Sequence, residues 1–284
     1  MLAYIVSAYK NLDQLARLAE RLNTERSVVY IHVDKKTDDA EFARLERTLA
    51  GRPRVHLLKR HVCHWGGFGH VRATLKGIDA LLASGSDFQH VVLLTGQDYP
   101  IKPVTEIERF FDEHRGTSFM AHSALPSESW PPTGGLDRIE YRHWRWWGHH
   151  VRLPWKRRFP VGLTAYGGGA YWNLSRACVE HVARFVESRP DVVDFFRHVD
   201  IADELFFQTV IMNSELARSV VNDNLRYIDW TRGPRPALLE VRDLPALRAS
   251  PKLFARKFDV LHDAEILDLV DTELLLEAER ASER

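Results

Sequence analysis

The chain has 284 residues, with 39 Lys and Arg against 39 Asp and Glu, so its formal net charge is zero. A balanced charge gives no reason to expect a nucleic-acid partner. The two cysteines, Cys63 and Cys178, are too few for a disulfide framework and fit a reducing compartment, although their pairing stays open. No apolar run reaches the length of a membrane span, and no charged segment precedes the apolar N-terminus. We therefore expect a cytoplasmic protein, and leave open a peripheral contact with the inner face of the membrane.

The first sixty residues alternate between short apolar runs and amphipathic segments. Apolar, β-branched runs predict buried strands, and apolar residues repeating every three to four positions predict helices. Strands are predicted at 2–7, 28–33 and 55–58, and helices at 11–22 and 39–49. This alternation is the opening of a parallel α/β sheet, in which ligands bind at the carboxyl ends of the strands. Asp34 follows the second strand and lies at such an end.

The α/β pattern continues and then breaks at residue 126. Asp98 follows another apolar strand. The segment 126–160 is rich in Pro, Trp and His, which predicts a long functional loop or a small subdomain. The region 1–262 is predicted to be one domain, and 263–284 an acidic helix or tail. The remaining predicted strands are 89–94, 117–121 and a strand pair or hairpin within 220–229. One further helix is predicted to end near 82, and others are predicted at 107–111, 178–187, 202–213 and 244–249.

A glycine run at 167–169 is followed by a short aromatic strand, a helix, and then a second helix that opens with Asp203 and Glu204. Consecutive glycines let the backbone approach a ligand or bend tightly. Acidic residues in the first turn of a helix are often caps that favour the helix dipole. The combination points either to a ligand site with an acid or base, or to a bend beside a capped helix.

Several motif-based functions are excluded. The chain has no P-loop, no G-x-G-x-x-G after its first strand, no G-x-S-x-G, no H-E-x-x-H and no paired C-x-x-C. It also lacks the D-x-D pair with which many nucleotide-sugar enzymes hold a metal, and Asn222-Asp223-Asn224 is the nearest approach to it.

Eight short motifs, in order, resemble the core 2 and I-branching β-1,6-N-acetylglucosaminyltransferase family, which also contains the peptide O-xylosyltransferases. Each motif is weak alone, but their order and spacing over about residues 4 to 259 make the resemblance specific. The motifs are Tyr4-Ile5-Val6, His32-Val33-Asp34, Trp65-Gly66-Gly67, Leu93 to Ile101, Gly168 to Trp172, Asp203 to Phe206, Trp230, and Leu253 to Asp259.

The resemblance implies a GT-A-like α/β fold with a mostly parallel sheet flanked by helices. It implies an inverting transfer from a UDP-sugar, with UDP-GlcNAc the first choice and UDP-xylose the second, to a glycan hydroxyl without a metal or other cofactor. A non-catalytic nucleotide- or carbohydrate-binding module of the same descent is the alternative. The implied roles are Glu204 as base, Val6, Asp34 and Trp65 at the uridine, Lys257 with Arg235 or Arg232 at the diphosphate, and Trp230, Gly168, Gly169 and Tyr171 on the acceptor side.

The residues themselves leave simpler roles open. Asp34 and Asp98 fit ordinary turn carboxylates, and Lys257 fits a solvated cation. The Trp-, Arg- and His-rich cluster at 143–150 fits a platform for sugar rings, a membrane-surface contact or a packed loop core.

Overall fold

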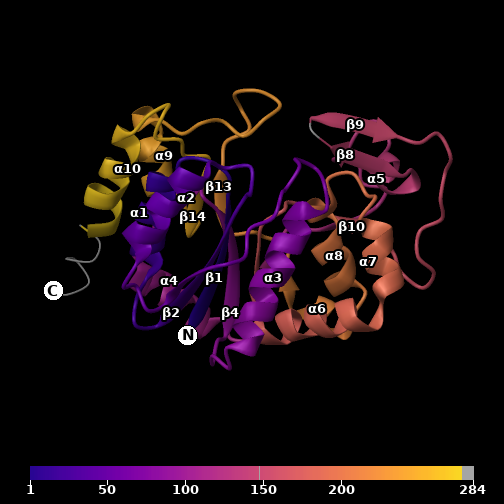
Figure 1. The fold of residues 1–284 in the computed structure, drawn as a ribbon, viewed down its shortest axis with the longest axis horizontal. Coiled ribbons are helices and arrows are strands. Elements are labelled where there is room, and N and C mark those ends of the chain that lie inside the picture. The colour runs from indigo at the N-terminus through magenta and orange to yellow at the C-terminus, as the bar shows by residue number, and fades with distance from the viewer. Residues whose placement is uncertain (147, 277–284) are drawn as a thin grey trace.

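The computed structural model describes residues 1–146 and 148–276. Its centre is a seven-stranded sheet in the order β12-β6-β11-β4-β1-β2-β3 (Figure 1). β3, β2, β1 and β4 run parallel, and β11 is antiparallel to both β4 and β6. The mostly parallel α/β sheet predicted from the sequence is confirmed. The strands are β1 Leu2–Ala8, β2 Ser27–Val33, β3 Val55–Leu57, β4 His90–Thr95, β6 Ser118–Met120, β11 Trp172–Ser175 and β12 Val220–Val221.

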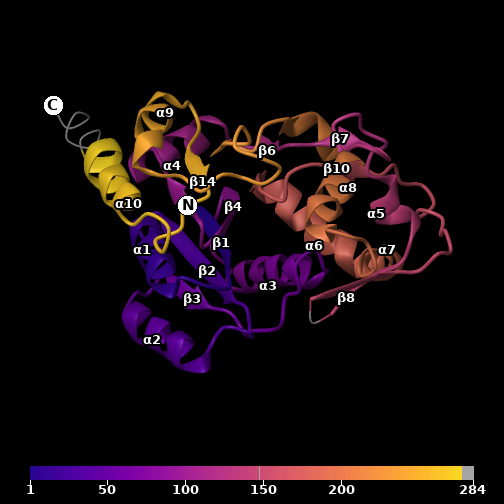
Figure 2. The same ribbon diagram turned by 90° about the horizontal axis from the view of Figure 1, so that it is seen from above.

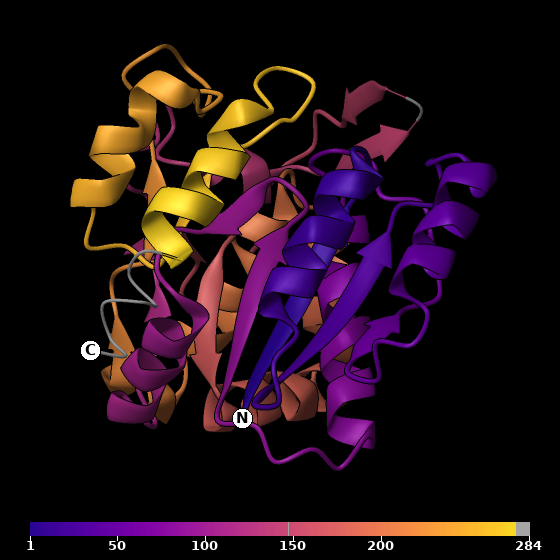
Figure 3. The same ribbon diagram turned by 90° about the vertical axis from the view of Figure 1, so that its left-hand side faces the viewer.

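Helices cover both faces of this sheet. Alternate side chains of a strand point to opposite faces, and β1 follows this rule: Tyr4 and Val6 belong to one hydrophobic core, whereas Ala3 and Ile5 belong to the other. The first core lies under α1, α2, α4, α9 and α10, and the second under α3, α6, α7 and α8 (Figures 1 and 3). The bounds are α1 Leu12–Leu22, α2 Asp39–Leu49, α3 Gly69–Ala83, α4 Val104–Glu113, α6 Arg176–Ser188, α7 Pro190–Phe196, α8 Phe206–Met212, α9 Leu244–Ala249 and α10 Glu265–Leu269.

A second, three-stranded sheet joins distant parts of the chain. It has the order β13-β14-β5, with β5 at Asp98–Pro100, β13 at Arg226–Ile228 and β14 at Phe254–Arg256. β5 is antiparallel to β14, and this pairing sets Asp98 opposite Arg256. Two of the motifs identified in the sequence, near residues 98 and 256, are therefore neighbours in space.

The segment 126–160 is more ordered than a simple loop. It contains the short helix α5, Leu136–Glu140, and an antiparallel hairpin of β8, His143–Trp146, and β9, His149–Arg152. The hairpin projects beyond α7 and α8 in Figure 1, and Figure 2 shows the same end of the molecule from above. A further two-stranded pair, β7 Ser123–Ala124 and β10 Tyr166–Gly167, closes the segment.

Two predictions of local structure were wrong, and one helix was not predicted. The strands in 220–229 do not pair with each other, because β12 pairs with β6 and β13 with β14. The helix predicted at 202–213 is interrupted, since Ala202–Glu204 forms a 3-10 turn and α8 begins only at Phe206. α7 was not predicted, and it begins at Pro190, a residue that suits the first turn of a helix.

The last described segment packs into the first core. α10 and the π-helix Val270–Leu276 bury Ile266, Leu267 and Leu275. Tyr99 donates a hydrogen bond of 3.0 Å to Asp271, which also pairs with Arg17. The remainder of the predicted acidic tail, 277–284, lies outside the described residues. Within the described ranges, no helix combines the length and the apolar character that crossing a bilayer would need.

Candidate active site

Asp34 lies where the sequence predicts it, at the carboxyl end of β2. Its backbone N–H donates to the carbonyl oxygen of Ala8, so it lies beside the end of β1 as well. Its carboxylate accepts hydrogen bonds from the side chain and backbone of Lys36, at 2.8 and 2.9 Å. Burial would raise the pKa of this carboxyl, but the Lys36 contacts and the Cys63 N–H hold it below the usual value. Asp34 is thus a buried, ionised acceptor at the strand ends.

Val6, assigned to the uridine site by the resemblance, has no exposed surface. It is fully buried in the first core, between β2 and β4. A side chain at the centre of a sheet packs against the covering helices, so the Val6 side chain is not exposed to a ligand. The residues of β1 nearest to Asp34 are instead those at the end of the strand.

The turn that carries Glu204 is held by contacts from three separate segments. The N–H of Ile201 donates to Gly66 at 2.7 Å, and the N–H of Gly168 donates to the carbonyl oxygen of Glu204 at 2.9 Å. The Arg138 guanidinium of α5 donates to Glu204 Oε2 at 2.6 Å. Among the described residues, Oε1 of Glu204 has no hydrogen-bond partner. The carboxylate is therefore fixed through one oxygen and available through the other.

Burial affects both Glu204 and Asp203, but within the described part of the chain only Glu204 has an arginine partner. Burial raises the pKa of Glu204, and the Arg138 pair offsets part of this effect. Burial also raises the pKa of Asp203, whose Oδ1 has no partner among the described residues. A carboxyl with a raised pKa that still faces solvent suits proton transfer near neutral pH. The helix-cap interpretation does not apply, because these residues form a 3-10 turn ahead of α8 and no side-chain cap is present there.

A cationic and aromatic group adjoins Glu204. The Arg256 guanidinium lies over the Tyr171 ring at 4.2 Å, and its Nε is 3.5 Å from Asp98 Oδ1. Burial is the largest influence on both residues: it raises the pKa of Tyr171 and opposes ionisation of Arg256. The negative charge of Glu204 raises the pKa of both. The other oxygen of Asp98 accepts from Thr95 N–H at 2.7 Å and fixes the turn after β4. Asp98 therefore holds both the turn and Arg256.

The glycine run is explained mainly by packing. A Cβ at Gly168 would lie 1.9 Å from the carbonyl oxygen of Ala121, and one at Gly167 would lie 2.6 Å from the Trp130 ring. A Cβ at Gly169 would meet only Asn224, at 3.4 Å. The Gly169 carbonyl accepts a hydrogen bond of 2.7 Å from Gln208 of α8. Gly167 and Gly168 thus let neighbouring groups approach, and only Gly169 has room beside it.

Lys257 directly follows β14, and the two arginines proposed to act with it, Arg232 and Arg235, differ in their contacts. Burial lowers the pKa of Lys257, and the nearby cations Arg256, Lys10 and Arg235 lower it further. Arg232 is bound by two carboxylates, Asp229 at 3.0 Å and Asp243. Arg235 is exposed, and it forms no ion pair with any described residue. A concentration of cations around Lys257 is suited to an anionic ligand.

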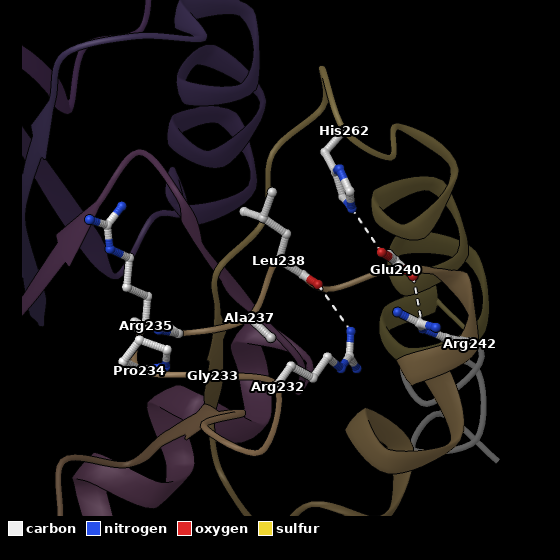
Figure 4. Close-up of a pocket in the computed structure, with 10 residues that line it drawn as sticks. Arg232, Gly233, Pro234, Arg235, Ala237, Leu238, Glu240, Arg242 and His262 are labelled. Carbon is white, nitrogen blue, oxygen red and sulfur yellow. Dashed lines mark hydrogen bonds and ion pairs between the residues drawn. The ribbon is translucent and has the colours of Figure 1, made fainter.

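A surface pocket of about 370 Å³ lies along this loop (Figure 4). Arg232 and Arg235 extend in opposite directions from it: Arg232 reaches the carbonyl oxygen of Leu238, whereas Arg235 points away from the Glu240 side. The backbone of Lys257 adjoins this loop, because the N–H of Leu239 donates to its carbonyl oxygen. Arg235 is therefore the better placed of the two arginines to act with Lys257.

Several tryptophans are exposed on the surface. Trp65 is 69% exposed and its ring lies 4.8 Å from the Arg145 guanidinium of β8, while Trp230 is 56% exposed. Trp146 and Trp155 are also exposed, so the packed-core interpretation of the cluster at 143–150 is wrong for Trp146. Residue 147 lies outside the described residues. Gly66 has φ +70°, a conformation that favours glycine, and its turn presents Trp65.

The nearest approach to a D-x-D pair is occupied by structural contacts. Asp223 pairs with Lys252 at 2.5 Å, Asn222 binds the backbone of His122, and the Asn224 side chain accepts from Arg226 N–H. Two arginines of the site were not predicted: Arg138 and Arg256. Arg256 directly precedes Lys257 in a motif that the sequence singled out, whereas no local pattern marks Arg138.

Sequence comparison finds similarity to xylosyltransferases. Human xylosyltransferase 2 is 26% identical to the chain over 294 residues, which cover 96% of this chain and 33% of that protein. The xylosyltransferase oxt of Drosophila pseudoobscura is 28% identical over 283 residues, with 91% and 31% coverage. The chain belongs to the Core-2/I-Branching enzyme family, whose sequence model matches residues 2–248. The family predicted from the motifs is confirmed.

The chain spans about a third of the length of these curated relatives. Among solved structures, a galactosyltransferase LgtC in complex with donor and acceptor sugar analogs covers 90% of this chain and 87% of its own, with a TM-score of 0.43 and 10% identity.

Proposed function

We propose that this protein transfers a sugar from a UDP-sugar to a glycan hydroxyl, with inversion and without a metal ion. The observation that carries the proposal is the Glu204 carboxylate, which burial makes more basic and Arg138 fixes through Oε2. An inverting displacement needs one general base, placed to take the acceptor proton during attack. Glu204 Oε1 is available for that proton.

In the proposed step, the acceptor oxygen forms a bond to the anomeric carbon while the bond from that carbon to the UDP oxygen breaks. The acceptor proton passes to Glu204 Oε1, and the bonding electrons leave with UDP. The leaving diphosphate then gains negative charge. Lys257 and Arg235, with Arg256 behind them, supply fixed positive charge that would stabilise it.

The donor would lie across the strand ends, with its uracil and ribose toward Asp34 and Trp65. The acceptor would lie on the Tyr171 and Trp230 side, between Glu204 and solvent. The exposed Trp146 and Trp155 on the projecting segment support an additional contact there, with sugar rings or with a membrane surface. The two buried free thiols support a reducing, cytoplasmic setting.

UDP-GlcNAc remains the first donor to test, and the similarity to xylosyltransferases favours UDP-xylose as the second candidate. A binding and turnover screen against a panel of UDP-sugars tests this directly. We expect one UDP-sugar to bind best and to release UDP when a glycan acceptor is added. Binding of UDP without turnover of any donor would instead support a non-catalytic binding module.

Metal independence is tested with the same assay. We expect activity in a chelator-containing buffer without added Mn²⁺ or Mg²⁺. A strict requirement for added Mn²⁺ would contradict the proposal that side-chain cations, and no metal ion, stabilise the diphosphate.

A further inference from the structure

Three side chains with metal-binding atoms meet close to Asp34, and the proposed transfer uses none of them. His32 is the penultimate residue of β2, while His61 and Cys63 lie on the loop between β3 and Trp65. His32 Nε2, His61 Nδ1 and Cys63 Sγ all lie within 4.8 Å of one another. His32 and Cys63 are buried, and His61 is half-buried. Side chains of this kind are the usual ligands of zinc.

The hydrogen bonds around the two histidines leave an unprotonated nitrogen on each ring. His61 Nε2 lies 3.0 Å from the Gly69 carbonyl oxygen, which can only accept, so this nitrogen carries the proton of the neutral ring. His61 Nδ1 is then unprotonated. The backbone N–H of His61 donates to His32 Nε2 at 3.1 Å, so His32 Nε2 is unprotonated too. A metal ion bound between these two nitrogens, 3.0 Å apart, would replace the contact of His32 Nε2 with the His61 N–H.

A metal ion at this point would bind both nitrogens. Metal ions require imidazole nitrogens without a proton, and the hydrogen bonds of the two histidines leave one on each ring. Asp34 lies near enough to interact with both histidines and with Cys63, and it contributes negative charge to the site.

We propose that His32, His61 and Cys63 bind a borderline-soft divalent cation of the Zn²⁺ type. Tetrahedral zinc with Zn–N bonds of about 2.0–2.1 Å separates its ligating nitrogens by about 3.3 Å, close to the observed 3.0 Å. The Gly69 carbonyl supplies the outer-shell acceptor that orients a ligating histidine. Coordination would ionise the Cys63 thiol, which burial otherwise keeps protonated.

The bound ion would act as a structural clip. It joins the end of β2 to the loop that leads to Trp65, and Cys63 N–H already contacts the Asp34 carboxylate at 3.4 Å. Fixing this loop would hold Asp34 and Trp65 in place. No bond made or broken in the proposed transfer involves the ion.

Co²⁺ titration of the chelator-treated full chain tests the site. We expect one equivalent to bind, with the thiolate-to-cobalt charge-transfer band and the strong visible bands of a tetrahedral ion. Cys63→Ser should abolish the charge-transfer band, and His61→Asn should weaken binding by more than the roughly 10–100-fold that an outer-shell partner contributes. Cys178→Ser is the matched control, because Cys178 is the other buried free thiol, and it should leave the spectrum unchanged.

X-ray absorption of the Zn²⁺-loaded wild type needs no variant to fold. It should give one sulfur at about 2.3 Å and at least two nitrogens at about 2.0–2.1 Å. A folded wild type that binds no Co²⁺ or Zn²⁺ would overturn the proposal, as would a zinc shell without sulfur or a charge-transfer band that survives in Cys63→Ser. These measurements do not depend on the transferase assay, so the site and the proposed activity fail or succeed separately.

Discussion

The Glu204 carboxylate and the Arg138 guanidinium form a 2.6 Å ion pair between residues 66 positions apart. The pair connects the turn before α8 to α5, within the Pro- and Trp-rich segment. Arg138 also stacks at 4.2 Å on the Trp130 ring, which in turn covers Gly167. The irregular segment therefore holds the proposed base in position.

Glu204→Gln removes the proposed base while keeping the size of the side chain. We expect turnover to fall by roughly 10²–10⁴-fold, the usual contribution of general base catalysis. UDP affinity should stay unchanged, since the proposed donor site lies at Asp34 and Lys257. Initial rates and UDP calorimetry measure the two effects. Glu140→Gln, whose carboxylate on α5 binds Lys156 instead, is the control, and a largely active Glu204→Gln would rule out the assignment.

Arg138→Gln should change the pH profile. Glu204 accepts a proton only when it is ionised, so activity is lost as the pH falls through its pKa. Arg138 lowers that pKa, and its removal leaves the effect of burial unopposed. The acid limb of kcat/KM should therefore move to higher pH, with activity recovering at alkaline pH. Arg138→Lys keeps the positive charge and should shift the limb less; an unmoved limb in Arg138→Gln would contradict the pairing.

The two candidate arginines should separate in a paired experiment. Arg235→Gln should weaken UDP binding and lower kcat, with up to about 3 kcal/mol lost in the transition state. Arg232→Gln should instead lower the melting temperature and change UDP affinity little, because Arg232 already pairs with Asp229 and Asp243. Calorimetry with UDP and thermal unfolding are both needed. The reverse order of effects on UDP affinity would assign the diphosphate to Arg232.

Two neighbouring glycines should respond differently to alanine. At Gly168 the new Cβ would collide with the Ala121 backbone, so we expect a loss of about 3 kcal/mol or more in the free energy of unfolding. At Gly169 the new methyl group has ordinary contacts, and the loss should be under about 1 kcal/mol. Urea unfolding measures both. A folded Gly169→Ala with poor acceptor KM would support a ligand at that position, whereas equal destabilisation would contradict the packing explanation.

The metal-free protein should lose stability on mild acidification. The pKa of His32 is about 4 when folded, below the ordinary value of 6.5. Between these values the unfolded chain binds a proton that the folded chain does not, so stability decreases as the pH falls from about 6.5 to 4. The loss from this one group is at most about 3 kcal/mol. Urea unfolding of chelator-treated protein at several pH values, with bound Zn²⁺ as comparison, measures it; a flat profile would contradict the buried neutral state.

Much of the fold could be predicted from the sequence because it depends on local patterns. Apolar strands and helical stripes predicted β1, α1, β2 and β4 closely, and α2 and α9 to the residue. The absence of nucleotide and hydrolase motifs, together with the order of the eight short motifs, indicated the family, which comparison confirmed. The roles of Glu204, Asp34 and Lys257 follow from the same motifs and remain predictions.

Only the tertiary structure decided which side chains meet. Arg138 and Arg256 join the site through contacts with Glu204, Tyr171 and Asp98, and such contacts between distant segments leave no periodicity in the sequence. Burial depends on the whole fold. It raises the pKa of Glu204, and it leaves the Val6 side chain without exposed surface. The glycine run illustrates both levels: its flexibility is a local property, but the Ala121 carbonyl that Gly168 must accommodate is brought there by the folded chain.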